Sequence, residues 1–236
     1  MKKSMMTMNK SIILLSGGLD SVISLACAKE EYNISLALTF NYGQRAKNQE
    51  IAAAANIAKY YNIEYKVIDI PWLAEITSTS LVNISEKLPA LKINELDTID
   101  LTEESAKKVW VPNRNGVFIN IAASFADSYN YTHIIFGANS EEATTFPDNS
   151  QEFISRINES LQYSTMVKPE LVAPLINYNK KEIVKIGIEK KIPFNLIRSC
   201  YTDNQKHCGE CESCLRLKRA LTEIADKETC KLVFGD

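Results

Sequence analysis

The segment Ser16-Gly17-Gly18-Leu19-Asp20-Ser21 combines residue types that suit the binding of a phosphate group. Two adjacent glycines allow a tight turn whose backbone N–H groups converge on one point. A helix that begins near Ser21 adds the positive end of its dipole, which attracts an anion. The serine hydroxyls are further donors, and carboxylates such as that of Asp20 are ligands that magnesium prefers. A Gly-Gly turn alone would be ordinary structure, but the whole hexapeptide favours phosphate binding.

A second candidate site is a group of cysteines near the C-terminus. Four of the six cysteines lie close together, at Cys200, Cys208, Cys211 and Cys214. Cys-x-x-Cys spacing brings two sulfurs to one ion, and four thiolates suit tetrahedral zinc in a closed, structural site. An iron–sulfur cluster, or His207 in place of one cysteine, are alternatives that the spacing leaves open. Cys27 and Cys230 lie outside the pattern.

Alternating strand-like and helix-like patterns must position both sites. Strands are expected over residues 11–15, 35–40, 64–70 and 132–136. Helices are expected over residues 20–29, 48–61, 116–127, 150–162, 179–190 and 214–225. This alternation predicts right-handed crossovers and a Rossmann-like α/β fold, a parallel sheet with helices on both faces. The glycine-rich segment then lies at the carboxyl end of the first strand, where such folds bind nucleotides.

Composition and charge limit the class of protein. The chain has 236 residues, 45% of them hydrophobic, which is ordinary for a globular domain. Its 27 basic and 29 acidic residues give a formal charge of −2, which argues against a broad basic surface for nucleic acid. Residues 1–10 form a polar leader, and no apolar stretch reaches the roughly 20 residues of a membrane-spanning helix. We therefore expect a cytoplasmic protein without a membrane anchor, in a compartment where thiols stay reduced.

The glycine-rich motif is similar to the signature of the ATP-pyrophosphatase-loop families. Further segments narrow the resemblance to the 7-cyano-7-deazaguanine synthase family, over about residues 12–220. They are Thr39-Phe40-Asn41-Tyr42-Gly43-Gln44-Arg45, Val111-Pro112-Asn113-Arg114-Asn115, Thr145-Phe146-Pro147-Asp148 and Ser199-Cys200-Tyr201. The resemblance implies an adenine nucleotide α-hydrolase-like fold, with an ATP-binding α/β domain over 10–195. Within this domain, the weak periodicity and polar composition of about 71–109 predict an irregular insertion or mobile lid. It also implies a zinc-binding helical segment over 196–236 that packs on this domain.

The resemblance implies an ATP-dependent ligase that forms a C–N bond. In this family ATP adenylates the carboxylate of 7-carboxy-7-deazaguanine, ammonia displaces AMP, and a second adenylation converts the amide to the nitrile. ATP with magnesium is then a cosubstrate, zinc is structural, and the small-molecule substrates are bound by a homodimer. No Ser–His–Asp or Cys–His arrangement is recognised, in keeping with a reaction that needs positioning and charge neutralisation.

Residue roles follow from the same resemblance. The residues expected at ATP are Leu15, Ser16, Gly17, Gly18, Leu19, Asp20, Ser21, Val22 and Phe40. The residues expected to act in catalysis are Asp20, Ser21, Arg114 and Lys180. The residues expected at the substrate are Gln44, Arg45, Phe146 and Asp148, with Phe146 stacking on the deazapurine and Asp148 pairing with its guanidine-like edge.

The chain departs from the usual family pattern in three places. Ala46 replaces a frequent histidine, Asn113 replaces a glycine, and the segment 142–150 differs around its Phe-Pro-Asp. Two alternatives therefore stay open beside the synthase. One is a relative that transfers the adenylated acid to another amine, even on a protein, and the other is a different pyrophosphatase-loop ligase. A non-catalytic nucleotide-binding module is disfavoured because Asp20 and both serines are kept.

Overall fold

Five parallel strands form the centre of the structure, a computed structural model that describes residues 9–235. Residues 1–8 of the expected polar leader lie outside this range. The strand order is β3-β2-β1-β4-β5. The strands are β1 (Lys10–Leu14), β2 (Asn33–Asn41), β3 (Glu64–Asp69), β4 (His133–Ile135) and β5 (Glu170–Val172). Every pairing is parallel, so the predicted parallel sheet is confirmed. The chain reverses its direction of winding between β1 and β4, which opens a crevice at their carboxyl ends.

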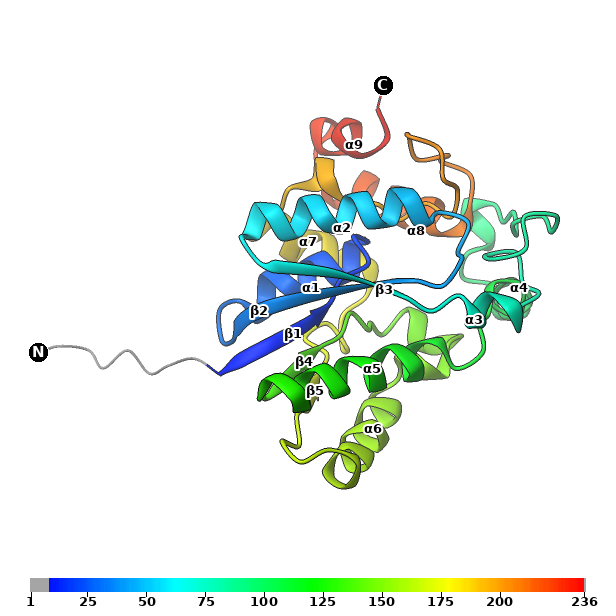
Figure 1. Ribbon diagram of the computed structural model, residues 1–236. Helices are drawn as coiled ribbons and strands as arrows, with labels where there is room; N and C mark the ends of the chain where they lie inside the picture. Colours follow the sequence, from blue (N-terminus) through cyan, green and yellow to red (C-terminus); the bar gives the residue numbers. More distant parts are fainter. Residues whose placement is uncertain (1–8, 236) are drawn as a thin grey trace, which may run out of the picture.

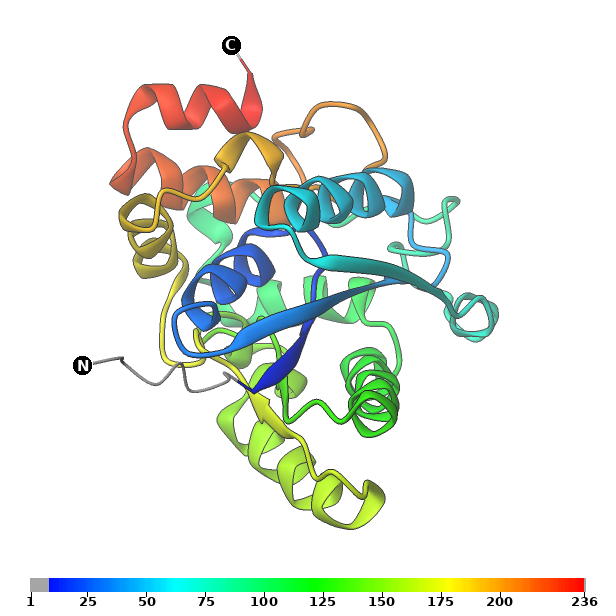
Figure 2. The same cartoon turned by 60° about the vertical axis from the view of Figure 1, so that its left-hand side comes forward.

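Helices cover both faces of this sheet, as Figures 1 and 2 show. One face carries α1 (Leu19–Ala28), α2 (Lys47–Tyr61), α7 (Lys180–Glu189), α8 (Glu212–Ile224) and α9 (Lys227–Phe234). The other face carries α5 (Arg114–Tyr129) and α6 (Gln151–Ser164). Successive side chains of β1 point to opposite faces of the sheet, so they contribute to two separate parts of the hydrophobic core. Ile13 packs with α1 and α2 on the first face, whereas Ile12 packs with α5 and α6 on the second.

The expected strands and helices are present, with ends that shift by a few residues. Outside the segment 71–109, the strand β5 and the helix α9 have no counterpart in the sequence-based prediction. The strand β5 has only three residues, which is too short for a period to be recognised. The helix α9 follows α8 after a short connection, and only Val233 of this helix is buried.

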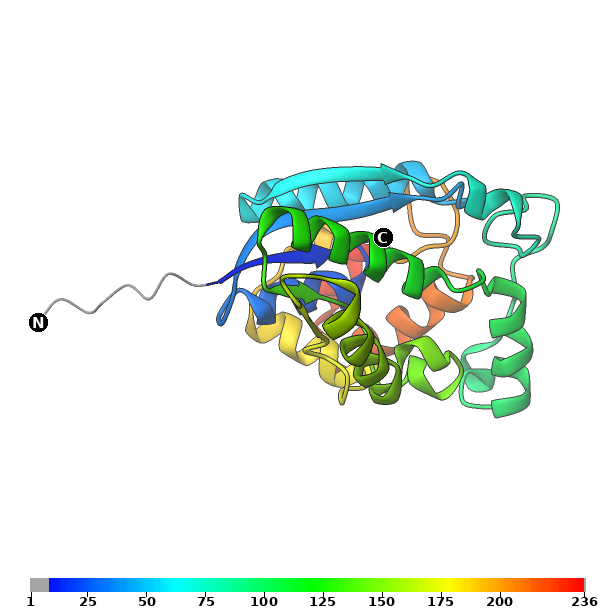
Figure 3. The same ribbon diagram turned by 60° about the horizontal axis from the view of Figure 1, so that its bottom comes forward.

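The segment 71–109 is more ordered than its sequence indicates. It contains α3 (Trp72–Glu75), the 3-10 turn η1 (Ile93–Glu95) and α4 (Ile99–Val109), beyond the arrowheads of β2 and β3 in Figure 3. The prediction of an irregular segment is therefore wrong for α4. The buried positions of this helix are Thr102, Ser105, Ala106 and Val109. Two of these inner positions are polar, whereas the apolar Ile99 and Leu101 of the same helix are exposed, so its apolar residues do not mark its buried face.

The C-terminal tail packs on the first face of the sheet. Leu217 and Leu221 of α8 and Val233 of α9 belong to the same buried cluster as Ile23 and Ile57. The tail thus shares the core of the α/β domain. Among the helices of residues 9–235, none combines the length and the apolar character that crossing a membrane requires.

Candidate active site

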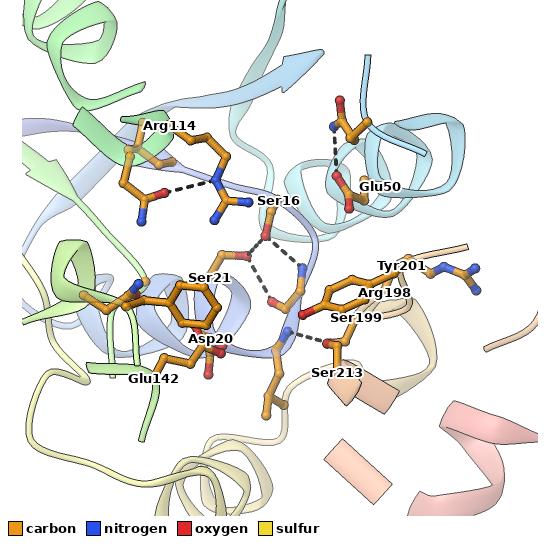
Figure 4. A pocket seen from close by; sticks show the side chains of 18 of the residues that line it. Ser16, Asp20, Ser21, Glu50, Arg114, Glu142, Arg198, Ser199, Tyr201 and Ser213 are labelled. Atoms are coloured by element: carbon orange, nitrogen blue, oxygen red, sulfur yellow. Dashed lines mark hydrogen bonds between the residues drawn. The ribbon is translucent and has the colours of Figure 1, made fainter. Parts of the chain in front are cut away.

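A pocket lies at the carboxyl ends of β1, β2 and β4, with Ser16 and Ser21 near its centre in Figure 4. Its walls come from segments that are far apart in the sequence. From the first half of the chain they include Leu15, Ser16, Gly18, Leu19, Asp20, Ser21, Phe40, Tyr42, Gln44, Glu50 and Arg114. From the second half they include Glu142, Phe146, Lys180, Arg198, Ser199, Tyr201, Glu212, Ser213 and Arg216. The glycine-rich segment, the expected catalytic residues and the cysteine-bearing tail therefore meet at one place.

The loop that follows β1 is stabilised by hydrogen bonds between its own side chains and its backbone. The amide of Gly18 donates to Ser16 Oγ at 3.2 Å, and Ser21 Oγ donates to the carbonyl of Gly18 at 3.0 Å. The two serine oxygens are 3.2 Å apart. The helix α1 begins at Leu19 after the N-cap Gly18 and has no side-chain cap. A helix start of this kind is a favourable place for an anion.

Gly17 cannot be replaced without strain. Its φ of +80° lies in the left-handed region, and a Cβ built there would be 2.8 Å from Cβ of Ala53 in α2. The loop therefore rests directly on α2, and only a residue without a side chain fits between them. Gly17 and Val22 do not appear among the pocket-lining residues, since the side chain of Val22 is fully buried in the core.

Lys180 joins the loop to the segment after β4. It is the first residue of α7, and its Nζ lies 2.5 Å from Asp20 Oδ2 and 2.6 Å from Glu142 Oε1. All three side chains are largely withdrawn from solvent, so the attraction is weakly screened. Sequence reasoning expected Asp20 and Lys180 at the site, but it did not predict their contact or the role of Glu142.

The charges in this group change the proton affinities of its members. Burial raises the pKa of Asp20 to about 6, although the nearby ammonium of Lys180 lowers it. Burial alone would lower the pKa of Lys180, but the charges of Asp20 and Glu142 raise it above its usual range. Burial opposes ionisation of Glu142 as well, yet Lys180 holds the pKa of this carboxyl below its ordinary value. At neutral pH the group is one cation between two carboxylates.

Arg114 occupies the opposite wall of the pocket. It is the first residue of α5, and its Nη1 lies 3.5 Å from the hydroxyl of Tyr42. Burial disfavours the charged guanidinium, but Tyr42 and the carboxylates of Asp148 and Glu50 raise the pKa of Arg114. Arg114 is half-buried, and within residues 9–235 no carboxylate is in direct contact with it, so its guanidinium is suited to an anionic ligand.

Aromatic side chains form the apolar part of the pocket wall. The ring of Phe146 stacks on Trp110 with centroids 6.2 Å apart, and Phe40 stacks on Phe118 at 4.1 Å. Phe40, Phe118 and Phe146 all line the pocket. A planar heterocycle has aromatic surfaces to pack on at both places.

The other expected substrate residues lie differently. The amide of Gln44 donates to the carbonyl of Phe40 and to Glu50 Oε2, each at 2.9 Å, so it holds the loop after β2 while lining the pocket. The guanidinium of Arg45 donates to the carbonyls of Asn83 and Glu86 and so anchors the insertion. Neither Arg45 nor Asp148 appears among the pocket-lining residues.

Several pocket residues were missed by sequence reasoning. Glu50 follows the second strand in the first turn of α2, and burial raises its pKa. Arg216 bridges Glu141 at 2.7 Å and Glu212 at 2.8 Å, which ties α8 to the segment after β4. The only sequence signal for these residues is the spacing of Glu212 and Arg216, which is that of a helical ion pair.

The four cysteines form a cluster that could hold a metal ion. Their sulfur atoms all lie within 4.8 Å of one another, with Cys208 Sγ and Cys214 Sγ 3.9 Å apart. Backbone amides donate to the sulfurs: that of Cys208 to Cys200 Sγ at 3.4 Å, and that of Cys211 to Cys208 Sγ at 3.3 Å. His207 Nε2 instead accepts a hydrogen bond from the amide of Ser199, so this nitrogen is not directed at the cluster.

Comparisons with known proteins identify the family of this chain. A family model described as "Queuosine biosynthesis protein QueC" matches residues 10–225. A 7-cyano-7-deazaguanine synthase of Pelotomaculum thermopropionicum is 51% identical over 211 residues, which is 89% of this chain and 96% of that protein. The synthase of the same name in Desulforamulus reducens is 50% identical over 214 residues, which is 91% of this chain and 94% of that protein.

A solved structure supports the fold. The U34-tRNA thiolase NcsA from Methanococcus maripaludis with its [4Fe-4S] cluster superimposes with a TM-score of 0.50 and 16% identity, over 95% of this chain and 70% of that one. At this identity the likeness concerns the fold alone. The sequence relatives carry the assignment, and by their identity and coverage the chain belongs to the QueC family of queuosine biosynthesis proteins.

Proposed function

We propose that the chain converts 7-carboxy-7-deazaguanine and ammonia to 7-cyano-7-deazaguanine at the expense of ATP, through an adenylated carboxylate and an adenylated amide. One observation carries the proposal beyond the name of its relatives. The glycine-rich loop, Lys180 and Arg114 surround a single pocket at the point where the winding of the sheet reverses. Such a place suits a nucleotide whose phosphates meet the loop and whose α-phosphorus faces the two cations.

In this proposal the loop holds the β- and γ-phosphates, and Asp20 holds the magnesium ion that accompanies them. The structure offers a fit for that ion. Asp20 Oδ1 is buried, and within residues 9–235 no group donates a hydrogen bond to it. Bound magnesium would neutralise charge on the departing pyrophosphate. Lys180 supplies a fixed positive charge at the same place.

The chemistry proceeds without a nucleophilic side chain. A carboxylate oxygen of the acid attacks the α-phosphorus, and the bond to pyrophosphate breaks. The nitrogen lone pair of ammonia then attacks the acyl carbon, AMP leaves, and loss of a proton gives the amide. In the second round the amide oxygen attacks the α-phosphorus of a new ATP. Pyrophosphate departs, the nitrogen loses both of its protons, and the C–O bond to AMP breaks to leave the nitrile.

For the acid, we assign stacking on the deazapurine to Phe146, which lines the pocket and is supported on its other side by Trp110. Gln44 shapes the floor of the pocket through its bonds to Phe40 and Glu50. Pairing of Asp148 with the guanidine-like edge requires this segment to turn toward the pocket. Arg45 acts from a distance, by fixing the insertion.

For the cysteine cluster we propose structural zinc. The distance of 3.9 Å between Cys208 Sγ and Cys214 Sγ matches a tetrahedron whose zinc–sulfur bonds are about 2.3 Å long, since its edges are about 3.8 Å. In a [4Fe-4S] cluster each thiolate binds a different iron, which separates the sulfurs further. With four protein ligands the ion has no open position for substrate. Free thiols in such a site favour the cytoplasm, and a homodimer is proposed from the family resemblance.

Product analysis tests the proposed function. The purified chain is incubated with ATP, magnesium, ammonium and 7-carboxy-7-deazaguanine, and the products are separated and identified by mass spectrometry. We expect the nitrile, with two AMP formed for each nitrile. Adenylate or AMP without amide or nitrile would indicate a different amine acceptor. No AMP with this acid, under conditions in which ATP binds, would contradict the proposed substrate.

A further inference from the structure

The peptide that leads into the cysteine cluster, residues 198–200, is hydrogen-bonded to the glycine-rich loop of residues 16–21, which we call the phosphate loop. The amide of Arg198 donates to the carbonyl of Gly17 at 2.7 Å, and the amide of Leu19 donates to Ser199 Oγ at 3.4 Å. These two hydrogen bonds fix the backbone of the loop on both sides of Gly18. The next residue, Cys200, is a member of the cluster. The loop is therefore one residue away from a proposed metal ligand.

A second contact reaches the loop through α2. The carboxylate of Asp203 accepts from the amide of Gln49 at 3.0 Å and from Asn48 Nδ2 at 2.6 Å. The N-cap of α2, Ala46, has no side-chain hydrogen bond, so Asp203 satisfies the start of this helix from about 150 residues away. The same helix carries Ala53, on which Gly17 rests.

The peptide that contacts the loop continues into a stretch without regular secondary structure. Residues 201–211, all within the described part of the chain, form neither helix nor strand. Arg198 holds this stretch by donating to the carbonyls of Thr202 at 2.7 Å and Asn204 at 2.6 Å. Further hydrogen bonds connect this stretch to the cluster: the amides of Thr202 and Cys208 both donate to Cys200 Sγ at 3.4 Å. Without a metal to gather the thiolates, these bonds lose their fixed partner.

We propose that metal binding at the cysteine cluster and nucleotide binding at the phosphate loop are thermodynamically coupled, with Ser199 and Asp203 as the positioning residues that transmit the coupling. The inference rests on the proposed ATP and zinc sites. The metal orders the peptide 198–211, and this peptide sets the backbone of the loop and the start of α2. Coupling of this kind is reciprocal, so nucleotide must tighten the binding of metal as much as metal tightens the binding of nucleotide.

The test measures zinc affinity by equilibrium competition with a zinc-selective chromogenic chelator. The full-length chain is titrated with and without a non-hydrolysable ATP analogue in excess magnesium. For the unmodified chain we expect the analogue to lower the apparent Kd for zinc about tenfold, within the usual range of coupling between sites. Ser199→Ala and Asp203→Asn should each bind one zinc but reduce this effect to less than about twofold. Asp226→Asn is the matched control, since Asp226 caps α9 at the amide of Thr229 and should leave the tenfold effect intact.

Calorimetry of the analogue with the zinc-loaded chain separates this inference from the proposed function. If the analogue binds and the zinc affinity does not change, the coupling is wrong and the ATP site stands. If the analogue does not bind at all, both are wrong. If Ser199→Ala and Asp203→Asn keep the full tenfold effect, the two positioning residues are wrongly assigned. If one variant fails to fold, the other variant and the unmodified chain still decide the question.

Discussion

The ammonium of Lys180 lies 2.5 Å from Asp20 Oδ2, a contact between residues 160 positions apart that joins the start of α7 to the start of α1. Both are first-turn residues of helices whose N-termini face the pocket. Because Glu142 takes a second contact with the same ammonium, one positive charge serves two carboxylates. Burial is the main reason that the pKa of Asp20 is raised; the charge of Glu142 adds to it, and the ammonium of Lys180 opposes it.

The pH dependence of the reaction should report this group. Burial raises the pKa of Asp20 to about 6, so its carboxylate is charged above that pH and neutral below it. We expect kcat/KM for ATP to rise with pH, with a midpoint near 6, because the proposed binding of magnesium requires the charged form of Asp20. Glu142→Gln should move the midpoint to lower pH, since the charge of Glu142 raises the pKa of Asp20. Glu152→Gln, on the exposed side of α6, is the control, and an unmoved midpoint in Glu142→Gln would contradict the assignment.

Replacement of Asp20 should separate function from stability. In Asp20→Asn we expect AMP formation to fall by about 100-fold to 1000-fold, because a group aimed at developing charge is lost. Since the pKa of Asp20 in the folded chain is raised from its ordinary 3.8 to about 6, its ionisation lowers the stability of the fold progressively between these two pH values, and the full cost is present above about 6. The melting temperature of the variant at pH 8 should therefore equal or exceed that of the unmodified chain. Asp69→Asn, at the exposed end of β3, serves as the control for both measurements. Unchanged turnover in Asp20→Asn would remove the metal–phosphate role.

The sequence predicted the parts of the site that are local in the chain. The glycine pair lies directly after a strand, and the four thiols are close together, so spacing alone indicates their chemistry. Lys180 was expected only from the family resemblance, since a Lys-Lys pair at a helix start is ordinarily solvated. Its burial and its two carboxylate partners depend on tertiary contacts that no local pattern contains.

The structural features that could not be predicted, such as the helix α4 and the burial of Glu50, depend on contacts between distant parts of the chain. The inner face of α4 carries Thr102 and Ser105, and Ser105 finds its hydrogen-bond partner in Glu212 of α8. Because a distant carboxylate satisfies Ser105, polar residues can occupy this buried face, and the apolar residues of the helix alone do not identify it. Glu50 is similar, because an acidic residue in a first helical turn is common and its burial becomes visible only when Gln44 folds against it.

Arg216 should be important for stability. Its side chain is only 12% exposed and neutralises Glu141 and Glu212. In Arg216→Ala, Glu141 still contacts Arg219 at 3.1 Å, but the buried Glu212 loses its arginine partner. We expect the free energy of unfolding in urea to fall by about 3–5 kcal/mol. Arg156→Ala is the matched control, because Arg156 also contacts two glutamates but is 67% exposed. It should cost less than about 1 kcal/mol. Similar losses in the two variants would show that burial does not decide the strength of these contacts.

If the cysteine cluster holds a structural metal, loss of one cysteine and removal of the metal should have effects on stability that do not add. Cys211→Ser removes one of four thiolates, so zinc content and melting temperature should fall together, the latter by about 10 °C or more, because metal binding and folding are coupled. Prolonged treatment with a strong chelator should lower the unmodified chain to the same temperature and leave Cys211→Ser unchanged, since both act on one interaction. Cys27→Ser, whose thiol lies outside the cluster, should keep the metal and respond to the chelator like the unmodified chain. A chelated chain that keeps its melting temperature would exclude a structural metal, and iron in place of zinc on elemental analysis would identify an iron–sulfur site instead.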